Sequence, residues 1–128
     1  HAIDFGHGIQ LPGNAGIGNV PATVQWTPGA DPEQQFVASL STCHMLWFLS
    51  LAAKRRFVVE SYVDEAFGVM EKNAEGKLAF SRITLRPKIQ FSADGSPTAS
   101  ELEALHHAAH EQCFIANSLK CEVVVEAG

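Results

Sequence analysis

The fold of this chain depends most on one stretch, DPEQQFVASLSTCHMLWFLSLAAK, residues 31–54. Asp31 can cap a helix, Pro32 suits the first helical position, and Glu33 favours the positive end of the helix dipole. From Phe36 to Ala53, apolar residues occupy nearly every face of the predicted helix. The stripe at helical spacing consists of Phe36, Leu40, Cys43, Trp47 and Ser50. A helix that is apolar nearly all round must be buried, so we expect it at the centre of the fold or at a subunit interface.

The segments around this helix predict strands, turns and a second helix. Residues 1–30 hold six of the ten glycines and three of the six prolines, so we expect short strands joined by turns. Residues 58–91 predict a β-hairpin, with its turn at residues 73–76 and a bulge near Ser81 and Arg82. Thr98 begins a capping box ahead of a second helix over residues 98–114, and residues 121–126 predict a terminal strand. This order predicts one α+β domain over residues 1–128.

Composition excludes several classes of function. Nine Lys and Arg against fourteen Asp and Glu give a net charge of −5, and no basic run exceeds residues 54–56, so we expect no nucleic-acid partner. Uninterrupted apolar runs fall short of the roughly 20 residues that span a bilayer, and no signal-peptide pattern opens the chain. Three cysteines are too few for a secreted disulfide framework. We therefore expect a cytoplasmic protein without a membrane partner.

The cysteines allow two interpretations. Cys43 and Cys113 fall on apolar faces of the two predicted helices, where a cysteine is most simply a small buried hydrophobe. Alternatively, one thiolate attacks a peroxide and becomes a sulfenic acid, which the second thiol converts to a disulfide. Cys121 lies at the start of the terminal strand and is most simply a buried small residue, although it could compete in disulfide exchange.

The segment from Asp31 to His44 resembles the signature around the first cysteine of the OsmC/Ohr proteins, the osmotically inducible and organic hydroperoxide resistance family, and most closely its OsmC-like branch. A cysteine at the end of the second helix and a Val-rich terminal strand extend the resemblance over the chain from about Asp31 onward. It implies an OsmC-like fold, with antiparallel sheets around two long central helices in an intertwined homodimer.

The resemblance also implies an activity. The expected function is thiol-dependent reduction of organic hydroperoxides in oxidative stress defence, with Cys43 peroxidatic and Cys113 resolving. Glu33 matches the active-site carboxylate of the family. A dithiol, of lipoyl type or another, would be the reductant, and no bound cofactor or metal is implied.

Two features of the sequence depart from the expected active site. The family places an Arg from its N-terminal strands beside the carboxylate, but residues 1–30 contain no Lys or Arg. Glu33 and Cys43 differ by ten positions, about 15 Å along an unbroken helix and about 280° around it, so we expect a break before Cys43. The missing Arg favours an alternative, a non-catalytic dimer that holds a hydrophobic small molecule in a pocket around Phe36, Leu46 and Trp47.

The histidines suggest a third possibility. His106 and His110 are spaced i, i+4, with His107 and Glu111 beside them, which is a spacing found in zinc sites. The apolar stripe of the second helix does not place both on the buried side, so solvated or interface histidines are the preferred interpretation. His44 projects about 100° away from Cys43 on a helix, and we expect a packing neighbour rather than a base.

Overall fold

The computed structural model describes residues 1–16 and 28–126; residues 17–27 of the predicted N-terminal strand segment lie outside the described residues. The chain divides into two compact units, His1–Phe36 and Val37–Gly128. The elements follow the order β1 (Ala2–Gly6), β2 (Ile9–Pro12), α1 (Pro32–Lys54), β3 (Val59–Asp64), β4 (Phe67–Lys72), β5 (Leu78–Leu85), β6 (Pro87–Phe91), α2 (Ala99–Gln112), the 3₁₀ helix η2 (Ala116–Ser118) and β7 (Glu122–Val125). This is the α+β class that the sequence predicted.

The first unit contains a β-hairpin and the start of α1. Strands β1 and β2 pair antiparallel, and the turn between them is made by His7 and Gly8, both with positive φ. At the start of α1, Gln34 N donates to Asp31 Oδ1 at 2.7 Å, and Asp31 N donates to Gln34 Oε1 at 3.0 Å. These reciprocal bonds satisfy two donors at the helix terminus, so the predicted cap at Asp31 is confirmed.

Helix α1 is continuous from Pro32 to Lys54, and the predicted break before Cys43 is therefore wrong. Its buried residues are Leu40, His44, Phe48 and Ala52, which are spaced by four. The predicted stripe is thus only partly right, since Ser50 is exposed. Because apolar residues cover nearly every face, the sequence period could not select the face that packs inward.

Length and composition alone would also allow α1 to cross a membrane. Its 18-residue window has a mean hydropathy of 1.5, although no uninterrupted apolar run in it approaches that length. Only 22% of the window is buried within this chain. The core helix of a soluble protein meets the same criterion of length and composition, so the helix is weak support for a membrane span.

The predicted hairpin over residues 58–91 forms as two successive antiparallel pairings. Strands β4 and β5 pair around the turn at Asn73, whose Oδ1 accepts from Glu75 N and Lys77 N at 3.0 Å each. Val69 pairs with Arg82 while Met70 pairs with Phe80, so Ser81 is the extra residue of a bulge, where one was predicted. Strands β3 and β6 pair beyond this ladder.

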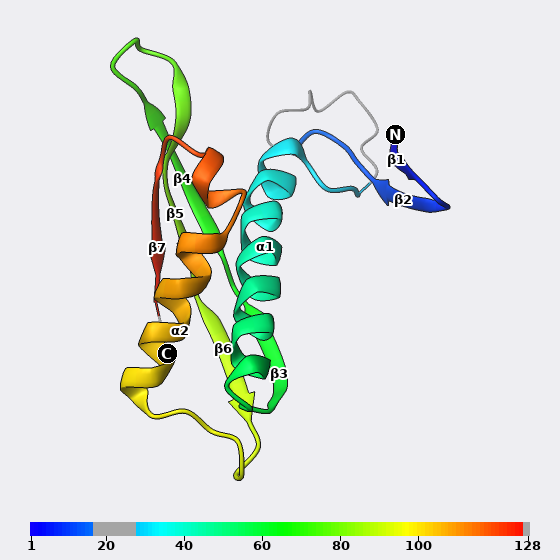
Figure 1. The fold of residues 1–128 in the computed structure, drawn as a ribbon. Coiled ribbons are helices and arrows are strands. Elements are labelled where there is room, and N and C mark those ends of the chain that lie inside the picture. The colour runs from blue at the N-terminus through cyan, green and yellow to red at the C-terminus, as the bar shows by residue number, and fades with distance from the viewer. Residues whose placement is uncertain (17–27, 127–128) are drawn as a thin grey trace. The chain divides into compact units, whose positions relative to one another are not determined.

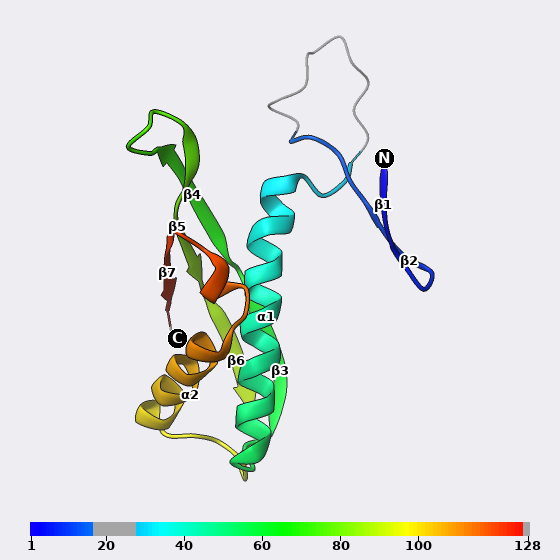
Figure 2. The ribbon, with the colours of Figure 1, turned by 45° about the horizontal axis from the view of Figure 1, so that its top comes forward.

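The terminal strand corrects one part of the predicted architecture. β7 pairs in parallel with β5, with Ile83 opposite Val123, so the three-stranded sheet β4-β5-β7 is mixed rather than wholly antiparallel. Helix α2 precedes β7 and carries the chain back along the sheet, which is the connection that parallel pairing needs. Figures 1 and 2 show α2 and η2 beside β5 and β7 in both views.

Two hydrophobic clusters form the core of the second unit. One contains Leu40 of α1, Ile83 and Leu85 of β5, and Cys113. The other contains Phe48 and Ala52 of α1 with Leu105 and Ala109 of α2. Thr98 caps α2 with the predicted capping box, because its side chain accepts from Glu101 N while Glu101 accepts from Thr98 N. The two helices therefore pack over the strands and bring their cysteine-bearing segments together.

Candidate functional site

The structure brings Cys43 and Cys113 into contact. Cys43 lies on α1 and is half-buried, while Cys113 is the C-cap residue of α2 and is fully buried. The two side chains lie close enough to influence each other's ionisation, Cys43 packs against the cluster that contains Cys113, and both cysteines are free thiols. Two cysteines that are seventy positions apart in the sequence thus meet in one cluster, as a peroxidatic and a resolving thiol would need to do.

The surroundings of Cys113 keep it protonated. Burial raises the pKa of the Cys113 thiol, and its hydrogen bond to the Cys43 side chain raises that pKa further. The backbone N–H of Ala116, which donates to Cys113 Sγ at 3.4 Å, acts in the opposite direction. A neutral, buried thiol is a poor first nucleophile towards a peroxide. It is better suited to attack a neighbouring sulfur that has already been oxidised.

The thiol pair lies in an apolar environment. Cys43 packs against the cluster that contains Leu40, Ile83 and Cys113, and Cys121 is a half-buried neighbour of the same cluster. The sequence interpretation of Cys121 as a small packing residue agrees with this position. Trp47 and Phe114 meet edge to face nearby, with ring centroids 5.6 Å apart.

The alternative, a binding pocket around Phe36, Leu46 and Trp47 in a dimer, stays a prediction. Leu46 is 58% exposed within this single chain. Trp47 is occupied by its edge-to-face contact with Phe114 and by packing against both core clusters. Phe36 belongs to the first compact unit.

Glu33 lies in the first turn of α1, in the first compact unit. Since α1 is continuous, ten helical positions separate Glu33 from Cys43 by about 15 Å along the helix axis. The expected break before Cys43 is absent, because Pro32–Lys54 is one helix. The role of Glu33 as a site carboxylate therefore stays a prediction.

The sequence analysis missed a second polar feature of the core, a pair of stacked histidines. His44 Nε2 lies 3.0 Å from His106 Nδ1, and the two rings are stacked with centroids 5.3 Å apart. The ring of Phe48 also stacks on the ring of His106, with centroids 4.5 Å apart. The sequence contained a signal for the burial of His44. It lies four residues after Leu40 and four before Phe48, and all three residues are on the buried face of α1.

Burial keeps both histidines neutral at neutral pH. Desolvation lowers the pKa of His44 to about 4, with smaller contributions from His106 and His110. Desolvation likewise lowers the pKa of His106 to about 4, and the nearby Asp64 opposes this shift. His44 is thus a core residue paired with another histidine, as expected of a packing neighbour rather than a base for Cys43.

The geometry does not support the zinc interpretation of the second helix. Among residues 1–16 and 28–126, no three His, Cys, Asp or Glu side chains are arranged to hold a metal ion. The side chain of His107 is 77% exposed and lies 3.9 Å from Glu111. His106 instead turns inward to His44, so neighbouring histidines of one helix point to different environments.

Fold and site together define a small α+β protein with a contacting thiol pair carried by two helices. The model of the family described as OsmC-like protein matches residues 25–128. A solved OsmC-like protein of unknown function from Vibrio cholerae is 48% identical, covers 98% of this chain and 82% of its own, and superposes with a TM-score of 0.92. The chain therefore belongs to the OsmC-like family.

More distant solved structures share the fold. An organic hydroperoxide resistance protein OsmC from Legionella pneumophila is 22% identical, with a TM-score of 0.62 over 78% of this chain and 69% of that one. The organic hydroperoxide resistance protein OhrB of Bacillus subtilis is 19% identical, with a TM-score of 0.62 over 78% of this chain and 71% of that one. No curated protein matches the chain.

Proposed function

We propose that this protein is a thiol-dependent peroxidase that reduces organic hydroperoxides in the cytoplasm. The observation that carries the proposal is the contact between Cys43 and Cys113, one half-buried and one fully buried, in a single cluster. The names of the distant structural relatives from Legionella and Bacillus support the same substrate class. A cytoplasmic site is part of the proposal because three free thiols suit a reducing compartment.

The proposed chemistry assigns one step to each cysteine. The Cys43 thiolate attacks an oxygen of the hydroperoxide, the O–O bond breaks, and the alkoxide takes up a proton to leave as an alcohol. Cys43 becomes a sulfenic acid. The Cys113 thiol then attacks Cys43 Sγ, which releases water and forms the Cys43–Cys113 disulfide. An external dithiol, of lipoyl type or another, reduces this bridge by two exchanges and is itself oxidised to a disulfide.

Removal of the proposed peroxidatic thiol should abolish turnover. We expect Cys43→Ser to lose hydroperoxide consumption, measured with cumene hydroperoxide and a dithiol reductant, to the level of the reaction without protein. Cys121→Ser is the matched control, since it removes a cysteine of the same cluster, and it should keep most of the wild-type rate. Equal rates for wild type and Cys43→Ser would refute the proposal.

We also propose that the protein is a homodimer. α1 is strongly apolar, yet only 22% of its 18-residue window is buried within this chain, and Leu46 is 58% exposed. A soluble protein rarely leaves such surface uncovered, and a second copy would cover it. Sedimentation velocity at micromolar concentration should give the mass of a dimer. A monomer with no dependence on concentration would contradict the proposal.

A further inference from the structure

The thiol pair has a binding chemistry that the proposed cycle does not use. Cys43 and Cys113 are free thiols in contact, and each is held in the core by a different helix. Cys113 is fully buried and Cys43 is half-buried, so a ligand reaches the pair from the side of Cys43. Two thiols that are already side by side lose little conformational entropy when both bond to one atom.

The surroundings favour a ligand that leaves the pair uncharged. Burial raises the pKa of the Cys113 thiol, and of the described groups that shift this pKa none is a Lys or an Arg. The cluster around the pair includes the apolar side chains of Leu40, Ile83 and Ile115. Two thiolates bound to a monovalent ion such as Cu⁺ would keep one net negative charge in this cluster, where its desolvation has no compensating cation.

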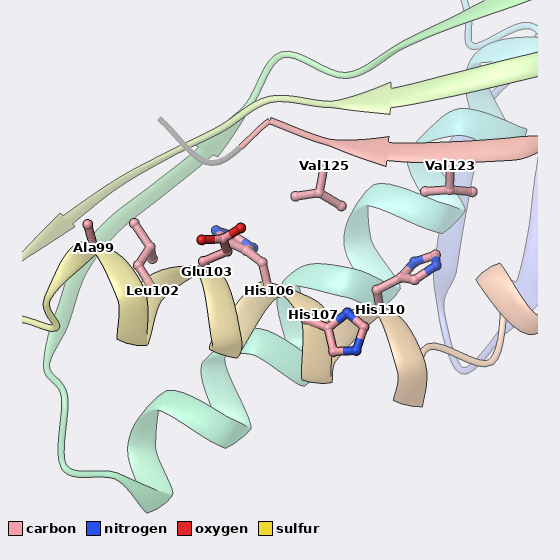
Figure 3. Close-up of a pocket in the computed structure, with 8 residues that line it drawn as sticks. All are labelled: Ala99, Leu102, Glu103, His106, His107, His110, Val123 and Val125. Carbon is pink, nitrogen blue, oxygen red and sulfur yellow. The ribbon is translucent and has the colours of Figure 1, made fainter.

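Divalent metal ions need more ligands than the pair supplies. Zn²⁺ in proteins takes at least three protein ligands. No three His, Cys, Asp or Glu side chains within residues 1–16 and 28–126 are arranged to hold a metal ion. The hollow between α2 and β7, which His106, His110 and Glu103 help to line, has no cysteine in its lining and is separate from the thiol pair (Figure 3).

We propose that Cys43 and Cys113 form a binding site for monosubstituted trivalent arsenicals, RAs(OH)2. Each thiol displaces one hydroxyl group: two As–O and two S–H bonds break, two As–S bonds form, and two water molecules leave. No electron is transferred, and the product is uncharged, which suits the apolar cluster. Two sulfurs bound to one pyramidal arsenic lie about as far apart as two sulfurs in van der Waals contact, so the bond geometry matches a contacting pair.

Titration of the reduced full chain with methylarsonous acid, with glutathione as the competing monothiol, tests the site by intact-mass spectrometry. We expect one arsenic per chain. A digest of the wild-type adduct should contain the Cys43 and Cys113 peptides joined through one arsenic. Dimethylarsinous acid has a single exchangeable hydroxyl group, so it should bind wild type at least about a hundredfold more weakly, because it forms no second, intramolecular bond.

Two variants provide a matched comparison, because each keeps two of the three cysteines. Cys121→Ala retains the contacting pair and should bind methylarsonous acid as tightly as wild type. Cys113→Ala retains Cys43 and Cys121 and should bind it at least about a hundredfold more weakly.

Three results would overturn the proposal. The first is equal affinity of wild type for the two arsenicals, and the second is a pair of joined peptides in which Cys121 replaces Cys43 or Cys113. The third is equal affinity of the two variants for methylarsonous acid. The first two use wild-type protein, so they decide the question even if Cys113→Ala does not fold. None of these measurements contains a hydroperoxide, so a lack of peroxidase turnover would refute the proposed function and leave this inference standing.

Discussion

Replacement of Cys113 by serine should turn a renewable peroxidase into one that inactivates itself during turnover. Without the resolving thiol, the Cys43 sulfenic acid persists, and a second hydroperoxide oxidises it to sulfinic acid, which dithiols do not reduce. We expect the first turnover to be preserved and the rate then to fall with each addition of hydroperoxide. Mass spectrometry of the Cys43 peptide should show two added oxygens in Cys113→Ser and none in wild type.

Cys121→Ser provides the control for this result. It removes the third cysteine of the same cluster but leaves the contacting pair of Cys43 and Cys113 in place. It should resist overoxidation as wild type does. If Cys121→Ser, rather than Cys113→Ser, inactivates during turnover, the resolving role belongs to Cys121.

Acid should destabilise this protein strongly through the buried histidine pair. Above pH 6.5, His44 and His106 are neutral in both the folded and the unfolded chain, so they add no pH dependence. Between pH 6.5 and about 4, the unfolded chain binds protons that the folded core excludes, so the free energy of unfolding decreases as the pH falls. A pKa lowered from 6.5 to about 4 corresponds to about 3 kcal/mol for one ring. Because the rings interact, the two contributions do not simply add.

Urea unfolding at several pH values between 7 and 4 measures this effect. The double variant His44→Leu/His106→Leu replaces both rings with apolar side chains, and its free energy of unfolding should change much less over this range. His107→Gln, which removes an exposed ring from the same helix, should keep the wild-type pH dependence. The same slope in wild type and the double variant would show that the pair does not stay neutral in the core.

Local signals in the sequence predicted most of the secondary structure. Asp31 and Thr98 cap their helices through side-chain bonds that span three residues, so their partners are close in the sequence. The bulge at Ser81 could be predicted because the alternation of apolar and polar residues along the strand is interrupted there. The capping patterns and the broken alternation need no knowledge of the rest of the fold.

Features set by distant partners were not predictable in this way. The parallel pairing of β7 with β5 depends on how α2 returns the chain, and no residue of β7 encodes that choice. His44 and His106 are 62 positions apart in the sequence. Each histidine taken alone could be a surface residue, a metal ligand or a core residue. The many apolar residues of α1 concealed the face that packs inward, so the predicted stripe was only partly right. The break was expected because Glu33 and Cys43 were assumed to meet, and the continuous helix shows that this expectation was wrong.

The site was predicted from a resemblance rather than from periodicity. The segment around Cys43 matched a family signature, and the family is now shown by the match over residues 25–128. The contact between Cys43 and Cys113 is a tertiary feature that spacing could not give, and the structure supplies it. Glu33 was carried over from the same resemblance, and its pairing stays a prediction.

Peptide mapping of wild-type protein after one equivalent of cumene hydroperoxide tests the central claim most directly. The proposed cycle predicts an intramolecular disulfide between Cys43 and Cys113 as the main product, with Cys121 still a free thiol, and its reversal by a dithiol. A dominant Cys113–Cys121 bridge with Cys43 unmodified would contradict the claim. It would make Cys43 a packing residue and assign the redox chemistry to the C-terminal part of the chain.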